Sequence, residues 1–200
     1  MLKYPHLFEP IRLGKTQFKN RIFASPISER AHDSQNRPIA ECIAYYEQKA
    51  IGGVASVCVG DCVVDTKNGL YGEYMIHLDD PMARRSLNLL STAVTRQGAM
   101  ASVELQHAGL YAAGSRRAGN RVYGPCGGVD AEGNEYYEMP EDIILHTIDA
   151  YAKAAAFAKQ SGFGMVTIHG GHGWLFSQFL SSKVNLRRDK WGGSLENRMR

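Results

Sequence analysis

Two histidines, His169 and His172, stand where an apolar segment breaks into glycines, within the run VTIHGGHGWLFSQFL at 166–180. In a continuing strand, residues three positions apart point to opposite faces of the sheet. The two glycines between the histidines allow the backbone to turn, because glycine reaches φ values that other residues avoid. Both imidazoles can therefore converge beyond the carboxyl end of a strand, where their N–H groups would suit an oxygen that gains negative charge during a reaction.

The spacing alone also allows two different roles for this pair. Each histidine can be an ordinary polar side chain that is satisfied within the fold. Imidazole is also a common zinc ligand, which makes a metal site the second alternative. The H-x-x-H spacing is not the helical H-E-x-x-H pattern, and no third ligand stands out nearby. We therefore expect no metal at this position.

Apolar segments alternate with helical patterns along the chain, and these elements must position the histidines. We expect a β-hairpin within 5–19, strands at 21–27, 54–64, 100–108 and 164–169, and helices at 40–51, 80–97, 140–161 and 175–180. The strands at 21–27 and 54–64 are expected to be buried. A further helix is expected to start at Ser194. The nearly continuous apolar run at 54–64 is typical of a strand that is buried on both faces of a parallel sheet. The segments 65–79 and 109–139 are expected to be loops, and the longer one has the length of a substrate lid.

The alternation of strands and helices implies a parallel sheet, which can close in two ways. An open doubly wound sheet that binds a dinucleotide would carry G-x-G-x-x-G after its first strand, and this chain has none there. A complete (β/α)8 barrel needs roughly 250 residues. Four strand–helix units in 200 residues correspond to half a barrel. We therefore expect an α/β fold in which residues 1–200 form the N-terminal half of a TIM barrel, preceded by a β-hairpin.

The composition is that of an ordinary globular protein, with 44% hydrophobic and 22% charged residues. The net charge of +3 is small and the basic residues are scattered, which argues against nucleic acid or an anionic membrane as a partner. We see no apolar run that could span a bilayer and no signal peptide in MLKYPHLFEP. The four cysteines lack a C-x-x-C pattern, so we expect free thiols and a cytoplasmic location.

Four motifs, in the same order along the chain, resemble the old yellow enzyme family of FMN-dependent ene-reductases. They are LFEPIRLGKTQFKNRIFASPIS (7–28), ELQHAG (104–109), IHGGHGWLFSQFLS (168–181) and NLRRDKWGGSLENR (185–198). The chain looks most similar to the branch that contains 2,4-dienoyl-CoA reductase and the bile-acid-inducible oxidoreductases. The resemblance implies that FMN is reduced by NADH or NADPH and then reduces the C=C bond of an α,β-unsaturated carbonyl compound. The iron–sulfur cluster and FAD of that branch are expected only in a C-terminal part that this sequence does not contain.

The resemblance also implies roles for individual residues. His169 and His172 would hold the carbonyl oxygen of the substrate. A second set would bind the flavin: Pro26, Ile27, Ser28, Gly60 and Gln106. Within this set, the amide of Gln106 would meet the pyrimidine edge of the flavin because an amide both donates and accepts hydrogen bonds. Ser28 would lie near the flavin O4, where a hydrogen bond tunes the redox potential.

Two residues depart from the family pattern: Leu110, where many relatives carry arginine, and Trp174. Many relatives carry a tyrosine two positions after the second residue of the pair, and that tyrosine supplies a proton. This chain has Trp174 there, and an indole N–H has no readily transferable proton. Tyr111, another residue of 109–139, or water is then expected to supply the proton.

Two alternatives to an ene-reductase stay open from the sequence. A flavin-dependent amine oxidase or demethylase of the same barrel family is one, although a histidine pair suits a carbonyl better. A half barrel that is inactive by itself is another, since half a barrel leaves two strand edges unpaired. Two copies could also close a barrel together, so the sequence leaves a homo-oligomer open.

Overall fold

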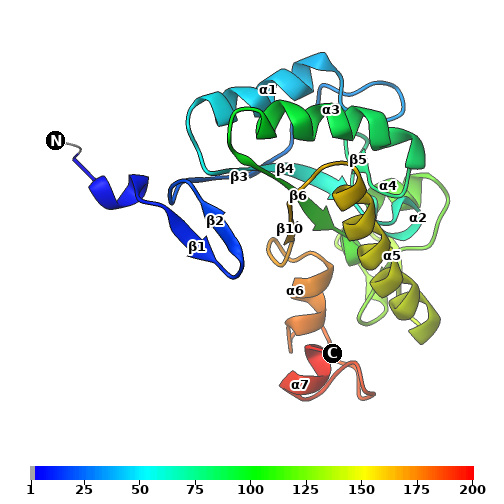
Figure 1. The fold of residues 1–200 in the computed structure, drawn as a ribbon. Coiled ribbons are helices and arrows are strands. Elements are labelled where there is room, and N and C mark those ends of the chain that lie inside the picture. Colours follow the sequence, from blue (N-terminus) through cyan, green and yellow to red (C-terminus); the bar gives the residue numbers. More distant parts are fainter. Residues whose placement is uncertain (1–2) are drawn as a thin grey trace.

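The centre of the molecule is a parallel sheet whose strands follow each other in chain order. The computed structural model describes residues 3–200. The sheet has the order β10-β6-β4-β3, with the short β5 also paired with β4 (Figure 1). Its strands are β3 (Phe23–Ile27), β4 (Ser56–Val63), β5 (Ile76–His77), β6 (Met100–Gln106) and β10 (Met165–Ile168). Because each strand–helix unit lies next to the one before it and the order does not reverse, the sheet is the wall of half a (β/α)8 barrel.

The strand β4 forms the middle of the core, as its apolar run predicts. Seven of its eight residues are buried, and only Asp61 is half-buried. It pairs in parallel with β6 on one side and with β3 on the other. The prediction of a strand buried on both faces is therefore confirmed.

Three helices pack against this sheet and against each other: α1 (Ala40–Ile51), α3 (Arg84–Thr95) and α5 (Glu141–Gln160) (Figure 1). Each presents apolar residues at helical spacing, such as the fully buried Leu87, Leu90 and Val94 of α3. The Asp80 carboxylate accepts a hydrogen bond from the Met82 backbone at 2.9 Å and so caps the short 3-10 turn η2 (Pro81–Ala83) that leads into α3. The predicted cap at Asp80 is confirmed, but it caps the 3-10 turn, and the α-helix itself begins at Arg84.

The N-terminal segment forms the predicted hairpin, with shorter strands than expected. A 3-10 turn, η1 (Pro5–Phe8), precedes β1 (Ile11–Leu13) and β2 (Thr16–Phe18), which pair antiparallel. Gly14 in the connecting turn has a φ of +59°, a conformation that favours glycine. Figure 1 shows this segment reaching away from the rest of the molecule.

The two segments expected to be loops contain regular structure, which corrects that prediction. The first holds α2 (Thr66–Gly69) and β5. The second holds η3 (Gly109–Tyr111), α4 (Ala113–Arg117) and a three-stranded sheet of β7 (Tyr123–Gly124), β9 (Glu135–Glu138) and β8 (Gly128–Val129). These strands are too short to show an apolar pattern, and their hydrogen bonds join residues that are distant in the sequence. Neither feature can be read from a local window of residues.

The first strand of the sheet is less buried than its sequence predicts. Phe23 and Ile27 of β3 are 39% and 50% exposed. The reason is that β3 has β4 on one side and, among residues 3–200, no strand on the other. The C-terminal segment agrees with the sequence: α6 (Leu175–Leu180) follows β10, and Ser194 caps α7 (Leu195–Arg198) through the Asn197 backbone at 3.2 Å.

A buried histidine at the end of β6 predicts how stability changes with pH. The Nδ1 of His107 accepts the Gly109 N–H at 3.0 Å, and its Nε2 is buried without a partner among the described residues. Burial lowers the pKa of this imidazole to about 4. The unfolded chain binds a proton at this histidine below about pH 6.5, whereas the folded chain does so only below about pH 4. The free energy of unfolding therefore decreases as the pH is lowered from about 6.5 to about 4.

We expect the free energy of unfolding to drop by about 2 kcal/mol from pH 7 to pH 5 on account of His107. Urea unfolding at the two pH values measures this difference. In His107→Gln, which cannot be protonated, most of the drop should disappear. A variant that keeps the full pH dependence would assign it to other groups, such as His32 and His77, whose pKa values burial also lowers.

Candidate functional site

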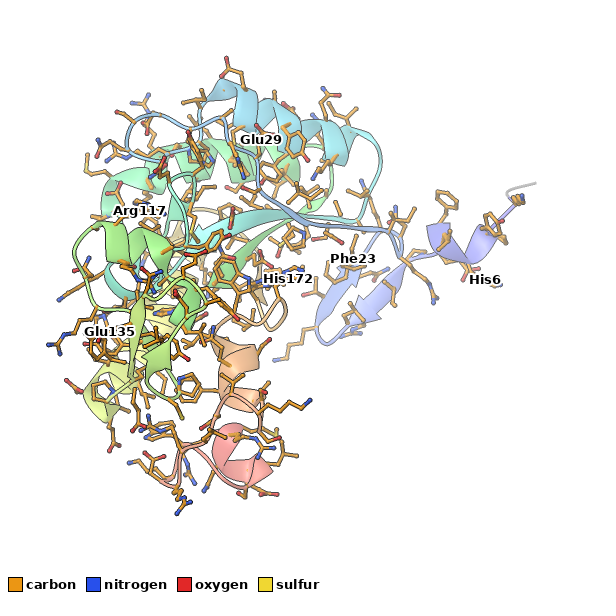
Figure 2. The ribbon with its side chains drawn as sticks, turned by 180° about the vertical axis from the view of Figure 1, so that it is seen from behind. His6, Phe23, Glu29, Arg117, Glu135 and His172 are labelled. Carbon is orange, nitrogen blue, oxygen red and sulfur yellow. The ribbon has the colours of Figure 1, made fainter. Side chains whose placement is uncertain are left out.

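The two histidines converge, as the glycines between them predict. His169 directly follows β10, and its backbone N–H donates to the Leu105 carbonyl at 3.0 Å, which holds it at the carboxyl end of the sheet. His172 lies in the loop that joins β10 to α6 (Figure 2), with a φ of +54°. The His169 Nε2 lies 3.2 Å from the His172 Nδ1. The turn therefore brings the two rings into direct contact at the end of the strand where barrel enzymes place their active sites.

A carboxylate that was not among the predicted site residues completes this cluster. The Glu104 Oε1 lies 3.1 Å from the His169 Nδ1, and their side chains are only 9% and 12% exposed. Burial raises the pKa of Glu104, while the neighbouring His169 and a hydrogen bond from the Asp61 backbone act in the opposite direction. The signal in the sequence was its place in ELQHAG, two residues before Gln106 and hence on the same face of β6.

Aromatic side chains surround the histidine pair. The Trp174 ring centroid lies 5.6 Å from that of His169 and 5.0 Å from that of Tyr71. Trp174 also packs against a small apolar cluster formed by Ala108, Ala112 and Val122. Tyr111 is half exposed, and its ring borders Gly173, where an added methyl group would lie 3.6 Å from the ring. Trp174 and the proton-donor candidate Tyr111 thus both lie in the neighbourhood of the pair, and Tyr71 joins them.

Gly60 allows β4 to approach β3 very closely. A methyl group on Gly60 would lie 2.7 Å from the Ile27 nitrogen, a distance that real side chains do not reach. The Tyr46 hydroxyl, from α1, donates to the Ile27 carbonyl at 2.7 Å and accepts the Gly60 N–H at 3.4 Å. The pairing of β3 with β4 shifts its register between Ala24 and Ile27. This contact fixes the position of the segment that carries Pro26, Ile27 and Ser28.

The segment at the end of β3 fits the flavin that the resemblance implies. The Ser28 hydroxyl is buried and has no hydrogen-bond partner within residues 3–200, and a buried unpaired hydroxyl is unfavourable. A bound group with a polar edge would satisfy it. Pro26 beside it is half-buried, and Ile27 is half exposed and offers an apolar surface.

Gln106 is buried and its side chain is bonded to the neighbouring strand β4. Its side-chain amide donates to the Asp61 carboxylate at 2.6 Å, and the residue is only 2% exposed. Asp61 has a φ of +60° at the irregular part of β4. Gln106 therefore supports this bulge in the structure, and its contact with a flavin stays a prediction.

Other features of the chain bear on its chemistry. Within residues 3–200, no group of three or more His, Cys, Asp and Glu side chains is arranged to hold a metal ion. The cysteines are free thiols, of which Cys42, Cys58 and Cys62 are buried and Cys126 is half-buried. No helix in the described part of the chain combines the length and apolar character needed to cross a membrane.

Known proteins resemble the chain over nearly its whole length. It is 32% identical over 198 residues to an NADPH dehydrogenase of Bacillus licheniformis, covering 97% of this chain and 56% of that protein. A structure of 2-naphthoyl-CoA reductase in complex with 2-naphthoyl-CoA superposes with a TM-score of 0.90 at 28% identity, covering 98% of this chain and 32% of that one. Old Yellow Enzyme from Pichia sp. AKU4542 gives a TM-score of 0.89 at 28% identity, covering 96% and 53%.

The chain thus spans between about a third and just over half of the length of these relatives. The half barrel agrees with this coverage, because the superposed part of each solved structure includes nearly all of the chain described above. The sequence pattern that defines the NADH:flavin oxidoreductase / NADH oxidase family matches residues 6–200. The chain therefore belongs to the NADH:flavin oxidoreductase / NADH oxidase family.

Proposed function

We propose that the protein acts as an FMN-dependent NAD(P)H oxidoreductase that reduces the activated C=C bond of α,β-unsaturated carbonyl compounds. The observation that carries this proposal is the contact of His169 with His172 at the carboxyl end of β10. Membership in the family supports the flavin and the nicotinamide. The names of two relatives, NADPH dehydrogenase and 2-naphthoyl-CoA reductase, support a reductant and a carbonyl-activated substrate of this kind.

Residues at the end of β3 and within β4 would hold the cofactor. Ser28 offers a hydroxyl that no described residue pairs, Ile27 offers an exposed apolar side chain, and Gly60 keeps the backbone of both strands in place. When bound, FMN accepts a hydride from NADH or NADPH and delivers it to the β-carbon of the alkene. The protein must keep the alkene oriented and stabilise the charge that develops on its carbonyl oxygen.

The histidine pair would provide that stabilisation. An N–H donor that is already in place interacts more strongly with an oxygen as its negative charge grows, and this difference is what accelerates a reaction. His169 is held by a neighbouring carboxylate and by its own backbone, so little reorganisation is needed. An amine substrate has no such oxygen, and for this reason we favour an ene-reductase over an amine oxidase or demethylase.

The first test asks whether the chain binds FMN and turns over. The protein is incubated with FMN and desalted, and the visible absorption spectrum is recorded. Oxidation of NADH and NADPH is then followed with and without 2-cyclohexenone under anaerobic conditions. We expect a retained flavin band and enone-dependent oxidation. A retained flavin that is reduced by NAD(P)H but never reoxidised by the enone would contradict the proposed substrate class.

Trp174→Tyr tests the proton donor. The substitution places a phenol, whose proton is transferable, where the indole packs 5.6 Å from His169. We expect flavin retention to be unchanged and the enone-dependent reoxidation step to become faster. Stopped-flow absorbance of the flavin separates this step from its reduction by NAD(P)H. If only the reduction step changed, the position would serve the nicotinamide instead. Tyr111→Phe in the same assay tests the second candidate.

A further inference from the structure

Three ionisable groups form a continuous chain at the candidate site. The Glu104 Oε1 lies 3.1 Å from the His169 Nδ1, and the His169 Nε2 lies 3.2 Å from the His172 Nδ1. Glu104 is almost buried at one end, and His172 is exposed at the other. Of the four ring nitrogens in these two histidines, the Nε2 of His172 alone takes no part in these contacts. Among these four nitrogens, it is therefore the one that is free to meet an oxygen of a ligand.

The contacts determine which nitrogen carries a proton. An ionised carboxylate can only accept, so the His169 Nδ1 must donate to Glu104. In a neutral His169 the Nε2 is then an acceptor, and the His172 Nδ1 must donate to it. A neutral His172 with its proton on Nδ1 has none on Nε2. With Glu104 ionised and both rings neutral, the two histidines have no free N–H to offer to a carbonyl oxygen.

One added proton changes this outcome. If it binds to His172, the Nε2 becomes a donor directly. If it binds to Glu104, the carboxyl donates to the His169 Nδ1, the His169 proton moves to Nε2, and the His172 proton moves to Nε2 in turn. Both arrangements contain the same number of protons. In either one, the exposed nitrogen of His172 carries an N–H.

We propose that Glu104 is a positioning residue which couples the donor function of His172 to the uptake of one proton by Glu104, His169 and His172 together. A ligand oxygen would then bind tightly only when this proton is present. The identification of that oxygen as a substrate carbonyl rests on the proposed function, whereas the coupling itself rests on the contacts alone.

The other ionisable groups that face Glu104 do not take up the proton in place of Glu104, His169 and His172. On β4, the Asp61 carboxylate faces Glu104, and its charge disfavours a second negative charge. Cys58 and Cys62 of β4 and Tyr151 of α5 also face Glu104, and burial raises the pKa of all three. They therefore stay neutral near pH 7 and contribute no competing charge.

A direct test locates the protons without any cofactor or turnover. Long-range ¹H–¹⁵N spectra of the ¹⁵N-histidine-labelled protein at pH 8 show which ring nitrogen carries the proton. We expect Nδ1–H in both His169 and His172, assigned with the single variants His169→Gln and His172→Gln. On lowering the pH or adding acetate, the His172 Nε2 should gain a proton. A proton on Nε2 of His172 already at pH 8 without a ligand would overturn the proposal.

A second test measures the coupling with acetate, an anion with no proton of its own to give above pH 7. Its affinity for the wild-type protein should fall about tenfold for each unit that the pH rises from 7 to 8.5, as uptake of one proton requires. In Glu104→Gln, the amide can donate to the His169 Nδ1 without an added proton. The hydrogen bond between His169 and His172 then takes the direction that leaves an N–H on the His172 Nε2. We expect its affinity to change less than about twofold per pH unit and to exceed that of the wild type at pH 8.5.

Glu41→Gln, an exposed substitution on α1, is the matched control and should behave as the wild type. If the affinity for acetate changed equally with pH in Glu104→Gln and in the wild type, the proposal would be overturned. Failure of the proposed function looks different. In that case the protein shows no enone-dependent oxidation of NAD(P)H, yet the proton positions and the pH slope for acetate remain as described.

Discussion

His169→Ala is expected to lower kcat/KM for 2-cyclohexenone by about 10²- to 10³-fold, the loss typical of disabling one donor in a site that stabilises an oxyanion, because His172 then loses the neighbour that orients its ring and its proton. The substitution removes the ring that joins Glu104 to His172, so both contacts disappear together. FMN retention should not change, because the residues expected to hold the flavin, among them Ser28 and Gly60, do not include the histidine pair. The rate of NAD(P)H-dependent flavin reduction should likewise stay near the wild-type value.

The control for this variant is His6→Ala. His6 lies in the N-terminal segment, far from His172 in Figure 2, and its side chain is 84% exposed. It should leave both half-reactions unchanged. If His169→Ala reduced 2-cyclohexenone at the wild-type rate, the pair would not act on the substrate carbonyl. If it lost the flavin instead, the pair would support the cofactor site.

The second large effect is expected from Gly60→Ala. The new methyl group would lie 2.7 Å from the Ile27 nitrogen and 2.9 Å from the Ile27 carbonyl carbon, and backbone atoms of a paired strand cannot move aside alone. Overpacking of this kind costs about 1–3 kcal/mol of unfolding free energy. Because β3 must move as a whole, Ile27 and Ser28 shift with it. We expect a lower urea midpoint and weaker retention of FMN.

Gly72→Ala is the matched control, because a methyl group at Gly72 meets no atom of the described chain within 4 Å. Its urea midpoint and flavin retention should equal those of the wild type. The informative comparison is between stability and binding in Gly60→Ala. A variant that is destabilised but retains FMN fully would show that the close approach of β3 and β4 serves the sheet and not the cofactor.

The strand–helix framework could be predicted because its signals are local. The helix over 40–51 is bounded by residues whose pattern and closing glycines are visible in a short window, and the structure reproduces its ends as Ala40–Ile51. The apolar run of β4 marks a strand that is buried on both faces. The glycines between His169 and His172 likewise predict a turn that allows the rings to converge. In each case, neighbouring residues determine the conformation.

The sheet of β7, β8 and β9 could not be predicted in this way. Val122 accepts a hydrogen bond from the backbone of Tyr137, and Gly124 accepts one from Met139, both at 2.8 Å. Partners this far apart are chosen by the path of the whole chain. The exposure of β3 has the same origin, since burial of a strand depends on what lies on both of its sides.

The half barrel, the family and the histidine pair at the end of β10 all follow from the order of the residues. Two contacts and one unpaired group became visible only in the folded chain: Glu104 of β6 meets His169, Gln106 is bonded to Asp61, and the Ser28 hydroxyl is buried without a partner among residues 3–200. The physical reason is that strand and helix patterns repeat over a few residues. A hydrogen bond between side chains of different strands depends instead on the register and spacing of the sheet, which no single segment encodes.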